Sequence, residues 1–164
     1  MHHYYPLTQR SGAQFRIFGF FKNDHPVENL QQAENYVARL DRVKDKLACL
    51  RENIEISRVD GYLPPQFMID YNIEALSDIQ PGVGTELSMY YTFAEKLEEV
   101  AEIDDSDRQR LLSEALDTIE NSVIPAYGSL VEQLQGLESA PEQAGVGLMP
   151  YNPDSEEDAA ELPD

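Results

Sequence analysis

The longest run of regular hydrophobic spacing lies between residues 28 and 65. Its apolar side chains recur at steps of three and four, which places them on one stripe of an α-helix. Charged residues fill most of the other positions, so the pattern predicts an amphipathic helix of about seven turns, at 3.6 residues per turn. We expect this helix to be central, with the rest of the chain covering its stripe or extending from it. The stripe consists of Leu30, Ala33, Val37, Leu40, Val43, Leu47, Leu50 and Ile54.

The carboxyl end of this helix is predicted near Asp60 and Gly61. Glycine readily takes the left-handed conformation that closes a helix, and Pro64-Pro65 follows a few residues later. Because proline is tolerated in the first helical turn, a new helix can begin at these prolines.

The remaining apolar patterns predict about four more helical segments. Residues 15–21 are too densely apolar for a one-sided helix and predict a largely buried segment. Gly12, just before this segment, and Gly19, within it, argue against an unbroken helix. Helical spacing recurs in residues 67–76, 85–103 and 106–134.

The last of these segments carries two local signals. Ser106, with Gln109 three residues later, has the form of a capping box and predicts the start of the helix. Pro125 lies inside the helical pattern, where it removes a backbone donor and is expected to kink or interrupt the helix.

These patterns predict an all-α fold, since no segment shows sustained alternation of apolar and polar residues. An irregular array of about five helices is favoured over a symmetric bundle, because Pro125 and segment 12–21 spoil regular packing. The helical domain is predicted to span residues 1–137 and an acidic tail residues 138–164. Residues 154–164 contain no basic or aromatic side chain. They cannot offset about 1–2 kcal/mol per residue of ordering entropy, so we expect the tail to be extended or disordered unless something binds it.

The charge of −19 is unevenly distributed over the chain. Lysine and arginine number 9 against 7 acidic residues through Arg58, 3 against 12 from Val59 to Arg110, and 0 against 12 from Leu111 onward. Nucleic acids and anionic lipids present negative phosphates, which such a chain repels. We therefore expect no nucleic-acid partner.

Membrane insertion is not expected either, since no stretch approaches the roughly 18–20 uninterrupted apolar residues of a membrane span. The start lacks the order of a signal peptide, so the chain as it stands is expected to be soluble. A signal or lipoprotein leader removed before residue 1 is the alternative, and it would give a periplasmic or lipid-anchored protein. Cys49 is the single cysteine, which excludes an intramolecular disulfide, and we expect its thiol to be buried and inert.

Residue types that usually carry chemistry form no convincing site. The three histidines, His2, His3 and His25, include no pair at the i, i+4 spacing of zinc ligands, so the chain alone is expected to hold no metal. His25 is read as a turn residue. The adjacent carboxylates Glu98-Glu99, Asp104-Asp105 and Glu156-Glu157 are typical of a solvated surface. The run from Asp104 to Asp107 lacks the glycine and distal glutamate of a calcium loop, and a helix cap explains it better.

Nucleophile and phosphate motifs are also absent from the sequence. Gly128-Ser129 falls inside a predicted helix rather than in a G-x-S-x-G turn, and Gly145-Val146-Gly147 is not followed by Gly-Lys-Ser/Thr. We therefore predict no catalytic, cofactor-binding or metal-ligating residue in this chain.

Scattered positions along the chain resemble a known bacterial family, the domain of unknown function 885. The resemblance lies in HYYPLTQRSGAQF, NYVARLDRV, LRENIEISRVDGYLPPQFMID, VIPAYGSLVEQL and AGVGLMPY. It covers residues 5–151 and includes Arg39-Leu40, Gly61, Pro64-Pro65 and Pro125-Ala126-Tyr127.

The resemblance implies a larger, mostly helical protein similar to zinc peptidases, with an H-E-x-x-H helix downstream of the matched region. No counterpart of that helix occurs here, so no zinc ligand is carried over, and zinc is implied only for the longer parent protein. The family continues past the glycine- and proline-containing stretch near residues 145–150, whereas here MPYNPDSEEDAAELPD ends in acid. Either the chain is a fragment cut at a linker, or it is a shortened relative.

Two hypotheses of function remain open at this point. In the first, the chain is the non-catalytic helical portion of a larger zinc-dependent peptidase or hydrolase. Its partner is then the missing catalytic half, and residues outside the chain cover part of the stripe from Leu30 to Ile54. In the second, it is a stand-alone acidic helical module that binds another protein or self-associates, with a tail that orders on a basic partner. Under both, this chain is not itself an enzyme.

Overall fold

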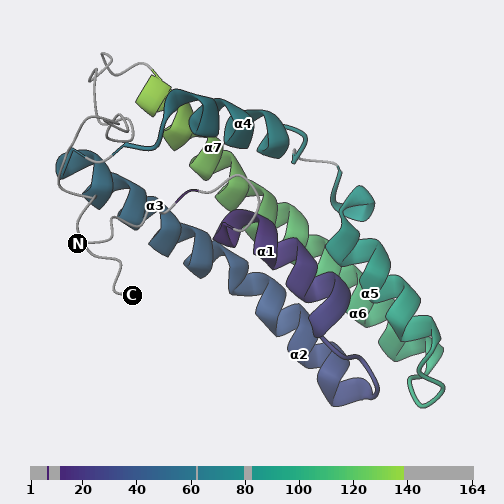
Figure 1. Ribbon diagram of the computed structural model, residues 1–164. Coiled ribbons are helices and arrows are strands. Elements are labelled where there is room, and N and C mark those ends of the chain that lie inside the picture. Colours follow the sequence, from purple (N-terminus) through teal and green to yellow (C-terminus); the bar gives the residue numbers. More distant parts are fainter. Residues whose placement is uncertain (1–6, 8–11, 62, 80–82, 139–164) are drawn as a thin grey trace, which may run out of the picture.

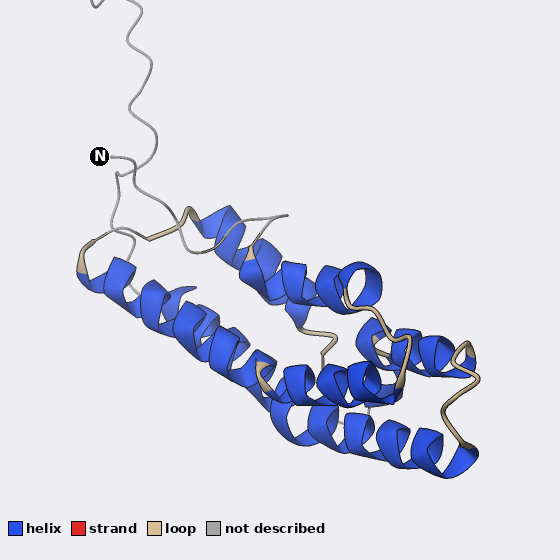
Figure 2. Ribbon diagram, turned by 90° about the horizontal axis from the view of Figure 1, so that it is seen from below, coloured by secondary structure: helices blue, strands red, loops and turns tan. Residues whose placement is uncertain are grey.

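The computed structural model describes residues 7, 12–61, 63–79 and 83–138, and their regular structure is entirely helical (Figures 1 and 2). The α-helices are α1 (Ala13–Gly19), α2 (Leu30–Asp41), α3 (Val43–Val59), α4 (Gln66–Leu76), α5 (Ser88–Glu98), α6 (Asp105–Thr118) and α7 (Ile124–Glu138). The shorter elements are two π-helical turns, η1 (Phe20–Asp24) and η3 (Ile119–Val123), and a 3-10 turn, η2 (Gly84–Glu86). Consecutive elements join into five helical runs over the described residues, so the predicted all-α array is confirmed.

These runs form an elongated array. In Figure 1, α2 and α3 follow one another along one long side, α6 and α7 along another, and α1 lies between them. Helix α4 packs on α7 at one end, and α5 packs on α6 at the other. Helix α7 ends at Glu138, and the tail from residue 139 lies outside the described residues, so its predicted disorder stays a prediction.

The predicted long helix is two helices, separated at Arg42. The amide of Arg42 donates to Arg39 O at 3.1 Å, three residues back, which is a tighter turn than the α-helical one. Neither proline nor glycine occurs there, so the sequence carries no signal for the break. Most of the stripe is nevertheless buried as expected, with Leu30 as the exposed exception at 37%. This chain's own α6, α7 and η3 pack against α2 and α3, so most of the stripe is covered without residues from outside the chain.

Both predicted signals at the end of this run are confirmed. Helix α3 closes at Asp60, and Gly61 has a φ of 81°, a conformation that side chains other than glycine rarely adopt. Helix α4 then begins directly after Pro65.

The predicted capping box at Ser106 is wrong by two residues. Asp104 is the residue before α6, and its Oδ1 accepts a hydrogen bond from the amide of Asp107 at 2.8 Å. Aspartate is as good a cap as serine, and here it satisfies an amide that the first turn leaves unpaired.

The predicted interruption at Pro125 is a widened turn. Because proline has no N–H, the carbonyl four residues earlier loses its helical partner. The π-helical turn η3 immediately precedes α7, where Pro125 is the second residue. The dense segment near the amino end behaves similarly, since α1 passes into η1 after Gly19.

Two buried tyrosines tie separate elements together. Tyr36 of α2 stacks on Phe93 of α5, with ring centroids 4.3 Å apart, and its hydroxyl donates to Met89 O at 2.7 Å. Tyr127 of α7 stacks on Phe18 and donates to Gln14 O of α1, also at 2.7 Å. Burial raises the pKa of both phenols, so both stay protonated and act as donors.

Candidate functional site

A groove of about 640 Å³ lies between the α1–η1 run and the α2–α3 run. We call it the cationic groove, because four positively charged side chains line it: Arg16, Arg39, Arg42 and Lys46. Its apolar surface comes from Ile17, Phe20, Phe21, Val43 and Leu50. Asp24 is the acidic residue among its lining residues, so the lining has an excess of positive charge.

Helical geometry explains how the cations come together. Arg39, Arg42 and Lys46 are spaced by three and four residues, so they lie along one face of the α2–α3 run. Arg16 comes from the opposite wall, on α1. All four side chains reach solvent while their stems border the apolar lining, an arrangement typical of long basic side chains.

Most of this positive charge is not neutralised within the described residues. Arg42 has an ion pair, to Asp45 at 3.2 Å, but both side chains are largely exposed, so the pair is weak. Arg39 lies over the ring of Phe20, 5.7 Å from its centroid, which holds the guanidinium against the groove wall. Neither Arg16 nor Lys46 has an ion pair in the described part of the chain, so the groove is suited to binding anionic groups.

The prediction that Cys49 is buried is wrong. The thiol is exposed and lines the cationic groove. On a helix that turns about 100° per residue, Cys49 points about 200° away from the fully buried Leu47. The only cysteine of the chain therefore lies at the groove.

His25 does lie in a turn, but its ring is buried, with 3% of the residue exposed. It packs against Phe20, Phe21 and Tyr36, and its Nδ1 lies 2.8 Å from Pro26 O. Nδ1 is therefore the protonated nitrogen, and Nε2 has no hydrogen-bond partner among the residues that the structure describes. Burial lowers the pKa of His25, and the charges of Arg39 and Lys96 lower it further against the opposing effect of the Pro26 contact.

Lys96 occupies the centre of the same region. Its Nζ donates to His25 O at 2.6 Å and to Phe21 O at 3.1 Å, so it joins α5 to the loop after η1. Burial lowers the pKa of Lys96, and the nearby Asp24 opposes the shift. The Lys96 contacts and the packing of the His25 ring together hold the loop after η1 against α5 and α2.

The paired carboxylates show the surface character that was predicted. Glu98-Glu99 and Asp104-Asp105 are exposed, at the end of α5 and the start of α6, and Glu156-Glu157 lies outside the described residues. Gly128-Ser129 falls within α7, as predicted. Within the described ranges, no three histidine, cysteine or acidic side chains are grouped as they would be to hold a metal.

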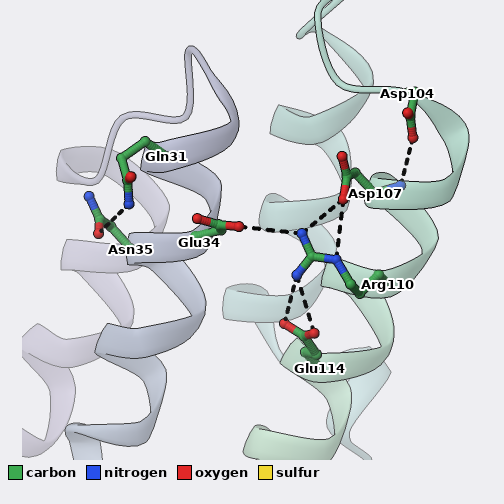
Figure 3. A network of polar contacts seen from close by, with 7 residues as sticks. All are labelled: Gln31, Glu34, Asn35, Asp104, Asp107, Arg110 and Glu114. Atoms are coloured by element: carbon green, nitrogen blue, oxygen red, sulfur yellow. Dashed lines mark hydrogen bonds and ion pairs between the residues drawn. The ribbon is translucent and has the colours of Figure 1, made fainter.

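Arg110 organises the acidic surface between α2 and α6 (Figure 3). Its guanidinium contacts Asp107 at 2.9 Å and Glu114 at 3.2 Å within α6, and reaches Glu34 of α2 at 3.4 Å. These charges are paired with one another across two helices, unlike Arg16 and Lys46 of the groove, which have no ion pair among the described residues.

Comparison with known proteins identifies the family. The family described as "Bacterial protein of unknown function (DUF885)" matches residues 1–161. The chain belongs to the DUF885 family. No curated protein matches this DUF885 chain significantly.

A solved structure shares the fold of this DUF885 chain. It is described as "the putative lipoprotein from Colwellia psychrerythraea", with 22% sequence identity and a TM-score of 0.77. The match covers 81% of this chain but 23% of that one, so this DUF885 chain spans about a quarter of the length of that protein. Among its described helices, none is both long and apolar enough to span a lipid bilayer.

Sequence reasoning missed the cationic groove. The spacing of residues 39, 42 and 46 was visible as a charged helix face, but the wall carrying Arg16 is brought there by the packing of α1 on α3. A charged face of one helix is usually only solvated surface, and a second element was needed to make it a groove.

Proposed function

We propose that this chain is the non-catalytic helical portion of a larger protein that resembles a zinc-dependent peptidase or hydrolase. One observation carries the proposal: a helical unit of this fold makes up 23% of a longer chain, while the match covers 81% of this one. The unit is therefore compatible with being one part of a longer polypeptide. In this proposal it forms a wall beside the substrate and supports a metal centre built from residues outside it.

Exposed apolar side chains where α3 leads into α4 support this proposal. Ile56 and Val59 lie three residues apart near the end of α3, with Val59 70% exposed. Phe67 and Tyr71 lie four residues apart on α4, with Phe67 57% exposed. Each pair shares one helix face, and pairs of large apolar side chains in water are typical of a surface that another element covers. This end, rather than the stripe of α2 and α3, is the proposed contact with the rest of the larger protein.

The test uses zinc content and peptide hydrolysis. The isolated chain is expected to purify without stoichiometric zinc and to leave peptide substrates intact. A longer family member divided into the portion that matches this chain and its remainder is expected to show zinc and activity only in the remainder or in the intact protein. Hydrolysis by the isolated chain, or zinc bound by it in stoichiometric amount, would refute the proposal.

A second candidate, a stand-alone acidic helical module, is favoured by the closed core. The stripe of α2 and α3 is covered by helices of the same chain, so the fold does not need an outside element to bury it. Sedimentation velocity separates the candidates. Val59→Lys and Phe67→Lys should abolish binding to the remainder of a longer relative if the first candidate holds. If the second candidate holds, the isolated chain should sediment as a defined oligomer or bind another protein, and the same two substitutions should abolish its self-association or leave its binding of other proteins unchanged.

A further inference from the structure

We propose that the acidic segment 154–164 of this chain docks in the cationic groove, with its carboxylates paired to Arg16, Arg39 and Lys46. This goes beyond the proposed function, since it assigns a ligand to a site that no comparison describes and does not depend on a catalytic half.

The cationic groove and segment 154–164 carry opposite charges. The groove presents cations without ion pairs among the described residues, in a chain whose net charge is −19. Segment 154–164 contains six acidic residues and no basic one: Asp154, Glu156, Glu157, Asp158, Glu161 and Asp164. Leu162 gives this segment one large apolar side chain that suits the apolar lining of the groove.

Residues 139–153 must span the distance from the end of α7 to the groove, and the contact of α7 with α3 allows this distance to be estimated. Gln133 of α7 is joined to Arg51 of α3 by two hydrogen bonds, of 3.3 and 3.0 Å. Glu138, the last residue of α7, is five residues further on, or about 7.5 Å at 1.5 Å per residue. Residues 139–153 can extend up to about 50 Å. Lys46 is about 7.5 Å along α3 from Arg51, so the segment can pass around α3, which is about 10 Å wide, and enter the groove.

The acidic segment is covalently joined to the chain that forms the groove. This matters because individual exposed ion pairs are weak. Connection within one chain through residues 139–153 gives an effective concentration on the order of millimolar, so several weak pairs can act together. A second copy of the chain has no such advantage. Because each copy carries a net charge of −19, their approach is opposed by repulsion. The structure therefore favours the chain's own segment as the occupant.

The exposed thiol at the groove provides the experiment. A nitroxide attached to Cys49 in the full chain is expected to broaden the amide resonances of residues 154–164, because docking brings them close to the label. In Lys46→Glu this broadening should be strongly reduced, whereas Lys22→Glu should retain it. Lys22 is the matched control, an exposed lysine of η1 that does not line the groove. About 1 M salt, at which charges act over about 3 Å, should abolish the broadening.

A second measurement avoids the label. Alkylation of the free Cys49 thiol by a neutral reagent should be several-fold faster in a full-length variant whose six acidic tail residues are changed to their amides. Equal alkylation rates, or broadening that is absent or equally strong in Lys46→Glu and Lys22→Glu, would overturn the proposal. Broadening seen only between a labelled and an unlabelled copy would assign the groove to a second chain and would also overturn it.

Discussion

Leu30 and Leu40 are equivalent in the sequence pattern but different in the structure, and replacing each with alanine tests the packing of α2. Leu40 is fully buried, whereas Leu30 is 37% exposed. Removing three carbons from a buried leucine loses about 2.4 kcal/mol, at about 0.8 kcal/mol per methylene. The cavity left behind adds to this loss, so Leu40→Ala is expected to lower the free energy of unfolding by about 3–4 kcal/mol. Leu30→Ala loses only part of the transfer free energy and leaves no closed cavity, so about 1 kcal/mol is expected.

The measurement is urea unfolding followed by circular dichroism, with thermal unfolding as a check. The slope of the free energy of unfolding against urea concentration should be unchanged in both variants, so that the urea midpoint reports stability directly. For a protein of this size about 1 kcal/mol corresponds to roughly 2–4 °C, so the melting temperatures of the two variants should differ by at least about 4 °C. Equal losses at the two sites, or a larger loss in Leu30→Ala, would show that the buried face of α2 has been placed wrongly.

Three further perturbations test the contacts between elements. Tyr127→Phe removes the hydrogen bond to Gln14 O and should cost about 1 kcal/mol in urea unfolding while leaving the helix content unchanged; no loss would mean that this bond adds nothing. Asp104→Ala removes the cap of α6 and should cost about 1 kcal/mol, whereas Ser106→Ala should cost almost nothing; the reverse order would restore the capping-box prediction. The pKa of His25 is lowered in the folded state from its ordinary value of 6.5, so as the pH falls below 6.5 the unfolded state takes up the proton first. Stability should therefore fall with pH below about 6.5, and His25→Phe should flatten that part of the profile of unfolding midpoint against pH; an unchanged profile would contradict the assignment.

The sequence predicted those parts of the fold that depend on local chemistry. Gly61 ends α3 because of its own backbone freedom, and Pro125 disturbs its helix because of its own missing donor. The break at Arg42 was not predictable in this way, because no residue near it prevents a helix from continuing. It is a property of how α2 and α3 pack against the other helices.

The candidate site was less predictable than the fold. Cys49 was expected to be buried because free cysteines usually are, yet its angular position on α3 turns it outward. Tyr36 was not predicted as a core residue because it lies beside the aliphatic stripe, although its ring stacks in the core on Phe93. The cationic groove needs α1 and α3 together, and no pattern within either helix indicates that they are neighbours.

The widened turn η3 also sets the rotational phase of the longest helical run. Buried residues of this run follow one another at intervals of four: Leu111, Ala115, Ile119, Val123 and Tyr127. On a regular α-helix each such interval drifts by about 40° around the axis, so the last member would leave the core face. A π-helical turn holds more residues than an α-helical one and cancels part of this drift. Deleting the exposed Asn121 from η3 would therefore turn α7 as a whole and carry Tyr127 away from α1.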